Sequence, residues 1–196
     1  KNYAQARPFT RVFYSQGPSL FSDFDGLFSQ NLTRGLNIFV GLQGTGTDGR
    51  FVNSASSLWN ARVKLRYELS PSLNLILSEN FTSSQTELNG GIDLSATPPG
   101  QEFEPIGAVP VNTDTYDKIT RHNLDLTVRA LLLGDSASVS LLSVYYNNGL
   151  REYRDEESAT RTNGIQVSHD HRSSWTGVAA SQTIVTGFQR LTVGGN

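Results

Sequence analysis

The chain has 196 residues, a formal net charge of −2 and neither cysteine nor methionine. The charge argues against nucleic-acid binding, and the lack of cysteine excludes disulfides, thiolate metal sites and cysteine nucleophiles. No run of about 18 apolar residues occurs, which excludes a transmembrane helix but leaves transmembrane strands of alternating polarity open. Because the chain starts at Lys1 and not at Met, we expect that an upstream segment such as a signal peptide has been removed.

The first third of the chain alternates between apolar and polar residues, after a weaker candidate strand, "FTRVFYSQ". Side chains of a strand point to opposite faces in turn, so strict alternation predicts a strand with one apolar and one polar face. In "LFSDFDGLFSQNL" the apolar set is Leu20, Phe24 and Phe28, and the polar set is Asp23, Asp25, Ser29 and Asn31. In "GLNIFVGLQG" the sets are Leu36, Ile38, Val40 and Leu42 against Asn37, Phe39, Gly41 and Gln43.

The segment "WNARVKLRYEL" has the strictest alternation of the chain. Its two sets are Trp59, Ala61, Val63, Leu65, Tyr67 and Leu69 against Asn60, Arg62, Lys64, Arg66 and Glu68. Eleven residues at about 3.3 Å each, tilted by about 40°, cross the apolar band of roughly 25 Å that a membrane presents. Strands of soluble sandwiches are usually about half as long.

The second half of the chain continues the pattern less strictly. "LNLILSENF" sets Leu73, Leu75 and Leu77 against Asn74, Ser78 and Asn80, and "NLDLTVRALL" sets Leu124, Leu126, Val128 and Ala130 against Asn123, Asp125, Thr127 and Arg129. "ASVSLLSVYY" is apolar with a blurred phase, and "SSWTGVAAS" and "RLTVGG" are weaker candidate strands. Eight or nine strands are therefore predicted.

The connections alternate between short and long. Tight turns are predicted at Leu32–Gly35, Ser70–Ser72 and Gly134–Ser136, and long links at roughly Thr45–Ser56, Ser83–Asp117 and Asn147–Asn163. Short turns at one end and long loops at the other are typical of outer-membrane barrels, in which they are periplasmic and extracellular respectively. Six aromatic residues also fall near strand ends, where an aromatic girdle would lie: Tyr14, Phe28, Trp59, Tyr67, Phe81 and Tyr145.

These patterns favour one all-β domain over residues 1–196, an antiparallel up-and-down transmembrane β-barrel or partial barrel of about 8–10 strands. A soluble β-sandwich also alternates and is the alternative fold. Single-chain bacterial barrels usually have an even strand number and end in an aromatic residue, whereas this chain ends in "LTVGGN". We therefore expect the domain to be a fragment of a larger barrel.

Residues Pro8 to Leu69 resemble the porin family of the Bacteroidota. The resemblance rests on an aromatic strand ending in Gln16-Gly17, the strand end "FSQN", a strand start at Leu36-Asn37, and a loop with Gly49, Phe51 and Asn53. Barrels of TonB-dependent receptors are similar at this level. The resemblance implies an outer-membrane barrel in a Gram-negative-type bacterium and does not indicate a transported substrate.

The polar residues of the strands are the candidate site. In a barrel they would line the lumen, where a ladder of cations on one strand favours anions. The residues predicted to line the lumen are Arg62, Lys64, Arg66, Asp23, Asp25, Asp125 and Arg129. On a soluble protein the same ladder would be a solvated surface. The acidic link from Ser83 to Asp117 would plug the pore, cap it or be a mobile surface loop, and folded inward its carboxylates would face the ladder.

No catalytic or metal site is predicted. His169 and His171 lie on one face of a candidate strand, but a metal would need a third ligand that the sequence does not supply, and no serine and histidine pair has a recognisable catalytic spacing. We expect a porin-like passive channel or the barrel part of a larger transporter, without a cofactor. A non-conducting structural or adhesive barrel and a secreted binding module remain alternatives. The expected partners are outer-membrane lipid, other envelope proteins or further barrel segments, and not nucleic acid.

Overall fold

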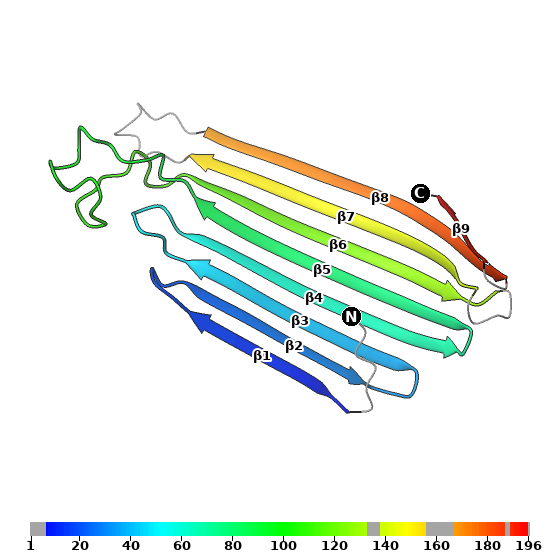
Figure 1. The fold of residues 1–196 in the computed structure, drawn as a ribbon. Helices are drawn as coiled ribbons and strands as arrows, with labels where there is room; N and C mark the ends of the chain where they lie inside the picture. Colours follow the sequence, from blue (N-terminus) through cyan, green and yellow to red (C-terminus); the bar gives the residue numbers. More distant parts are fainter. Residues whose placement is uncertain (1–6, 133–137, 156–166, 187–188, 196) are drawn as a thin grey trace.

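The computed structural model describes residues 7–132, 138–155, 167–186 and 189–195 as one antiparallel sheet of nine strands. Each strand pairs with its neighbours in the sequence, so the sheet order is the chain order (Figure 1). Within these residues, no helix is long and apolar enough to cross a membrane. The predicted all-β class and antiparallel up-and-down topology are confirmed.

The strands lengthen from the N-terminus towards β8. Their bounds are β1 (Phe9–Gln16), β2 (Ser22–Asn31), β3 (Leu36–Thr47), β4 (Ser56–Ser70), β5 (Leu73–Glu87), β6 (Tyr116–Ala130), β7 (Ser140–Asp155), β8 (Val167–Thr186) and β9 (Gln189–Gly195). Several strands extend further than the alternation predicts, and β5 and β7 continue to Glu87 and Asp155. The long links are correspondingly shorter than expected, because paired backbone carries the strands beyond their apolar segments.

The register between strands gives the sheet one apolar and one polar face. Directly opposed residues in a sheet share a face. Val63 of β4 lies opposite Val40 of β3, and Arg62 lies opposite Gly41. The predicted phases of β2 to β6 are confirmed in this register. The blurred phase of β7 also resolves, because Val144 pairs with Leu126 on the apolar face.

The two described tight turns lie at the end of the sheet opposite the long loops (Figure 1). Leu32–Gly35 joins β2 to β3, and the Leu32 backbone N–H donates to the Leu36 carbonyl oxygen at 2.8 Å. Pro71 and Ser72 join β4 to β5, next to a register shift between Glu68 and Ser70. The predicted turn at Gly134–Ser136 lies outside the described residues.

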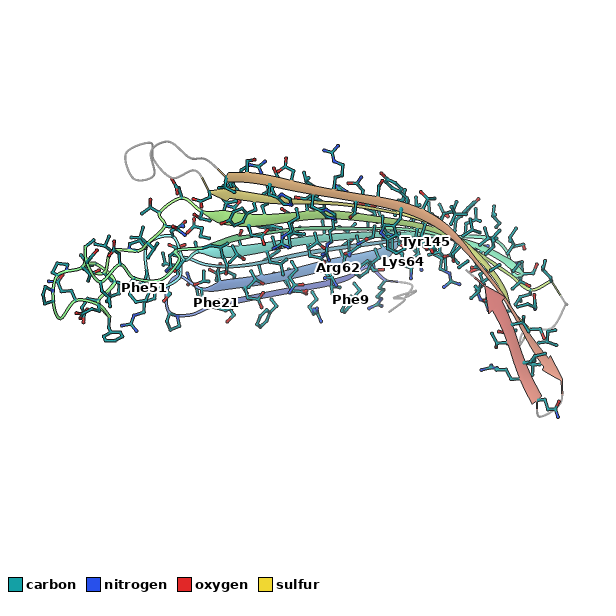
Figure 2. All side chains as sticks on the ribbon, turned by 90° about the horizontal axis from the view of Figure 1, so that it is seen from above. Phe9, Phe21, Phe51, Arg62, Lys64 and Tyr145 are labelled. Carbon is teal, nitrogen blue, oxygen red and sulfur yellow. The ribbon has the colours of Figure 1, made fainter. Side chains whose placement is uncertain are left out.

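The sheet is curved and is not closed into a barrel. Among the described residues β1 pairs only with β2, and β9 pairs only with β8. Figure 2 shows β8 and β9 bending towards the side on which Arg62, Lys64 and Tyr145 lie. The polar face is therefore the concave one. The closed barrel that the sequence predicts is therefore not formed by these nine strands alone.

The described residues form a single layer with almost no hydrophobic core. Leu27, Ala108 and Pro110 are their only buried apolar side chains. Large apolar side chains on the convex face are exposed instead, including Val63, Leu126 and Val178. Within the part of the chain that the structure describes, the apolar face is not covered by a second sheet, as it would be in a soluble β-sandwich, or by a helix.

Candidate functional site: the two faces of the sheet

The register places all the residues predicted to line a lumen on the polar face. Arg62, Lys64 and Arg66 are successive polar-face residues of β4. The other predicted residues share this face through chains of opposed residues. Asp25 on β2 connects to Asn60 on β4 through Gln43, and Asp23 lies opposite Thr45 of β3. On β6, Asp125 connects to Lys64 through Ser78, and Arg129 connects to Glu68 through Asn74. The structure thus places residues separated by more than a hundred positions in the chain on one face of the sheet.

Asp25 is the electrostatic centre of the N-terminal part of this face. Its Oδ1 accepts from Arg11 Nη2 at 2.6 Å, and its Oδ2 lies 3.5 Å from Arg62 Nη2. One carboxylate therefore serves two guanidinium groups from β1 and β4. Arg11 was not among the predicted site residues, because "FTRVFYSQ" has no clean alternation that would indicate its face.

Arg66, Asp23 and Asp125 also have partners on this face. Arg66 donates from Nε and Nη2 to Asn74 Oδ1, at 3.3 and 3.1 Å, and its Nη2 lies 3.8 Å from Glu68. Asp23 accepts from Thr45 Oγ1 at 2.9 Å. Asp125 accepts from Thr127 Oγ1 at 2.8 Å. The β4 ladder is thus partly neutralised by carboxylates on neighbouring positions of the sheet.

The acidic link between β5 and β6 is an ordered loop, residues 88–115, that extends beyond the strand ends (Figure 1). Asn53 Nδ2, from the loop between β3 and β4, lies 3.2, 3.3 and 3.1 Å from the carbonyl oxygens of Leu88, Asn112 and Thr115. A bridge between Ile92 and Pro110 closes the loop's base. These contacts hold loop 88–115 against its neighbour at the sheet end. The inward-folded arrangement over the β4 ladder is not observed.

The tip of loop 88–115 combines apolar and acidic residues. Phe103 and Ile106 are 78% and 102% exposed. The Phe103 carbonyl oxygen accepts from Arg50 Nη2 at 2.7 Å, which fixes the tip to the preceding loop. Backbone N–H groups of Glu102 itself and of Gly100 hydrogen-bond to the Glu102 carboxylate and lower its pKa. The tip is therefore anionic at neutral pH.

The apolar face carries a continuous band across the sheet. We call a set of directly paired residues a register row. The row through Leu65 contains only apolar residues from β3 to β8: Ile38, Leu65, Leu77, Leu126, Val144 and Val178. The row through Trp59, nearer the long loops, is apolar at β4 but reaches Arg172 at β8. The band thus crosses the strands obliquely.

One carboxylate interrupts this band, and sequence reasoning missed it. Glu79 lies in the row of Val63 and Leu124. Its Oε1 lies 3.1 Å from His122 Nδ1, and the His122 ring lies 4.8 Å from the Phe81 ring. The "SENF" segment has a polar residue on each side of Glu79, so its face could have been read from the phase of Leu75 and Leu77. The contact of Glu79 with His122 could not have been predicted, because it depends on the register between β5 and β6.

The two histidines of "SHDHR" lie on the same face of β8, as predicted, and the register shows that this is the polar face. His169 lies opposite Tyr153 and His171 opposite Arg151, and these four side chains line one cavity of about 390 Å³. Asp170, between the histidines, contacts Arg154 instead. Among the described residues no group of three candidate metal ligands occurs. Within the same part of the chain, Ser168, Ser173 and Ser174 make no hydrogen bond with a histidine.

Comparison with protein families, with curated proteins and with solved structures found no match for this chain. The resemblance to Bacteroidota porins therefore gains no support from these comparisons. The two faces of the sheet carry the functional conclusion.

Proposed function

We propose that the chain forms part of the wall of an outer-membrane β-barrel, with its apolar face on lipid and its polar face on water. The barrel would act as a porin-like passive channel or as the barrel part of a larger transporter. The observation that carries this proposal is the oblique, uncovered apolar band. Its slope, its exposure and the open sheet edges each support the same conclusion.

The slope of the band matches the strand tilt of membrane barrels. Going away from the long loops, the first apolar residue on this face is Trp59 on β4 and Val178 on β8, and Val178 shares a row with Leu65. The boundary therefore moves six residues along the strands while it crosses four strands. At about 3.3 Å per residue and about 4.8 Å between strands, this slope is about 45°. Strands of membrane barrels tilt by about 35–45°, so a band parallel to the membrane must cross them at such a slope.

Lipid accounts for the exposed band better than the β-sandwich alternative. A sandwich buries its apolar face against a second sheet, and the row through Leu65 has no such cover among the described residues. Leaving the band in water forgoes about 25 cal/mol for each Å² of apolar surface, and contact with lipid removes that cost.

The open edges favour a larger barrel. In an antiparallel meander β1 and β9 run in the same direction, so direct closure would pair them in parallel. Antiparallel closure needs an odd number of further strands, which gives an even total, as bacterial single-chain barrels have. In a membrane an unpaired edge would also leave backbone N–H and C=O groups without partners. We therefore propose that β1 and β9 pair with further barrel segments.

The polar face would line the lumen. It carries the β4 ladder, and Arg62, Lys64 and Arg66 would favour anions by focusing positive potential into a narrow pore. The contacts of Arg62 with Asp25 and of Arg66 with Glu68 reduce this bias. The exposed tip of loop 88–115 favours one alternative, an adhesive barrel whose loops bind another envelope protein. Conductance in a planar bilayer distinguishes the channel from a non-conducting barrel.

Spin labels at Val63 and at Arg62 test the membrane proposal. The two residues are neighbours on β4 but lie on opposite faces of the sheet. In lipid vesicles the label at position 63 should be accessible to oxygen and protected from a water-soluble relaxing agent, and the label at position 62 should behave in the opposite way. Equal accessibilities would reject a membrane-facing band. Protection of position 63 from both agents would indicate a second copy or another protein on the apolar face.

A further inference from the structure

We propose that the cavity between β7 and β8 on the polar face is an oxyanion-binding site that strengthens as the pH falls. The site consists of Arg151, Tyr153, His169 and His171, at the long-loop end of the sheet. Its ligand would be a small oxyanion or the anionic group of a larger solute, such as a sulfate, phosphate or carboxylate. The inference does not rest on the membrane proposal, because the cavity belongs to one face of the sheet whatever covers the other.

The register holds the four side chains together. Arg151 lies directly opposite His171, and Tyr153 lies directly opposite His169. Opposed side chains in an antiparallel pair are about 5 Å apart at Cβ, so the two pairs surround one space. The cavity of about 390 Å³ is large enough for a small anion with its first water molecules or for the anionic end of a sugar.

Asp117 of β6 orients the permanent cation of this site. Its Oδ1 and Oδ2 lie 3.0 and 3.1 Å from Arg151 Nε, and Oδ2 accepts from Nη2 at 2.6 Å. This bidentate contact uses one edge of the guanidinium and holds its plane. Within the described residues Nη1 has no hydrogen-bond partner, which leaves a positioned donor for a ligand.

The histidines and the tyrosine also have polar atoms available. Among the described residues, the side chains of His169, His171 and Tyr153 make no hydrogen bond or ion pair. A protonated imidazole presents two N–H donors and a positive charge, and a phenol presents one O–H donor. Together with Nη1 of Arg151, these groups offer donors to the oxygens of an anion.

A metal ion would not suit this cavity. The guanidinium opposite His171 would repel a cation, and Asp170 is directed away towards Arg154 on the other face. The described residues contain no third histidine or carboxylate grouped with the pair. A cavity rich in N–H and O–H donors, and free of carboxylates apart from the Asp117 that Arg151 engages, favours a negatively charged ligand instead.

The expected pH dependence follows from the charges on this side of the sheet. The titratable and charged groups that face the cavity or flank it are Asp117 and Arg121 on β6, Arg151, Tyr153 and Asp155 on β7, and His169 and His171 on β8. Asp117 is engaged by Arg151, and Asp155 accepts from Thr115 Oγ1 at 3.1 Å. Between about pH 8 and pH 5.5 the imidazoles are the groups that ordinarily gain charge. The cavity therefore becomes more positive as the pH falls.

Histidine NMR of the full chain in detergent, with sulfate as the probe, tests this inference. Sulfate does not titrate in this range, so any pH dependence belongs to the protein. The chain has three histidines, and His122 on the opposite face is an internal control. Sulfate should raise the apparent pKa of His169 and His171 and leave His122 unchanged. By calorimetry, sulfate should bind about tenfold or more tightly at pH 5.5 than at pH 8, since two added charges nearby contribute at least about 1.4 kcal/mol.

Three variants complete the test. The double variant His169→Gln with His171→Gln should abolish the pH dependence of sulfate binding. Arg151→Gln should weaken sulfate binding at both pH 5.5 and pH 8. Arg34→Gln removes a cation from the tight turn between β2 and β3, at the other end of the sheet, and should change neither the affinity for sulfate nor its pH dependence. The inference is overturned if sulfate shifts His122 as much as the pair, or shifts none of the three. Binding of Zn²⁺ that depends on His169 and His171, without binding of sulfate, would overturn it as well.

Discussion

Loop 88–115 and the apolar band of the sheet differ in whether the chain itself covers their side chains. The loop contains Thr97, Ala108 and Thr115, which are buried, and its backbone is tied down by Asn53 and by its own bridge. The band is larger and far more apolar, yet Val63, Leu126 and Val178 are exposed. The loop is thus stabilised by contacts within the chain, whereas the band has no such cover among the described residues and, in the proposed barrel, would be stabilised by lipid.

The largest expected effect is at the middle of the band. Leu65→Arg should lower the free energy of unfolding in lipid by about 2–4 kcal/mol, because an arginine on a lipid face near the midplane costs that much. Denaturant titration of the reconstituted chain measures this change. Lys64→Gln is the matched control on the neighbouring residue and the other face, and it should change the stability by less than about 0.5 kcal/mol. The reverse ranking would mean that the faces are exchanged.

A smaller and local effect is expected in loop 88–115. Asn53 has a φ of 55°, so glycine is the substitution that removes its amide without backbone strain. Asn53→Gly should leave the carbonyls of Leu88, Asn112 and Thr115 short of a donor and destabilise the loop by about 1–2 kcal/mol.

Hydrogen exchange distinguishes a loop effect from a global one. Amides that bond within the loop, such as those of Leu88 and Asn112, should exchange several-fold faster in Asn53→Gly. Amides of β4 and β5 should keep their rates, because the sheet does not depend on the loop. If exchange became equally faster in the loop and in the sheet, the two would unfold together. The loop would then not be stabilised separately from the sheet.

The smallest effect is expected where the band is interrupted. Glu79→Leu should raise the free energy of unfolding in lipid by about 1 kcal/mol, since it removes a carboxylate from a lipid-facing position and leaves His122 half exposed. His122→Gln is the counterpart that removes the partner and keeps the carboxylate, and it should destabilise. A loss of stability in Glu79→Leu would mean that position 79 faces water or a protein partner.

Much of the fold was accessible from the sequence. The phase of each strand from Phe24 to Ala130 follows from alternation, because period-two patterning assigns faces without knowledge of neighbouring strands. The blurred phase of β7 was not accessible, since Leu141 and Leu142 are both apolar and only the pairing of Val144 with Leu126 decides between the faces. Strand ends were also missed, because paired polar residues such as Gln85 have no apolar pattern.

The candidate site was accessible only as a list of residues on one face. Arg62 and Asp25 could be assigned to that face from their own strands, but their contact depends on how β2, β3 and β4 are aligned. The same is true of Arg151 and His171, which meet only through the pairing of β7 with β8. The sequence left the acidic loop open between a plug, a cap and a mobile surface loop, because the contacts of Asn53 that hold it at the sheet end have no signature in the sequence.

The apolar side of each strand follows from the residues of that strand alone, because the faces of a strand alternate every two residues. The tertiary structure alone decided the register, and with it the slope of the band, the pairing of Glu79 with His122 and the cavity around His169 and His171. The physical reason is that a shift along a strand by two residues preserves the faces and changes every cross-strand neighbour. Such a shift is resolved only by the summed contacts of neighbouring strands.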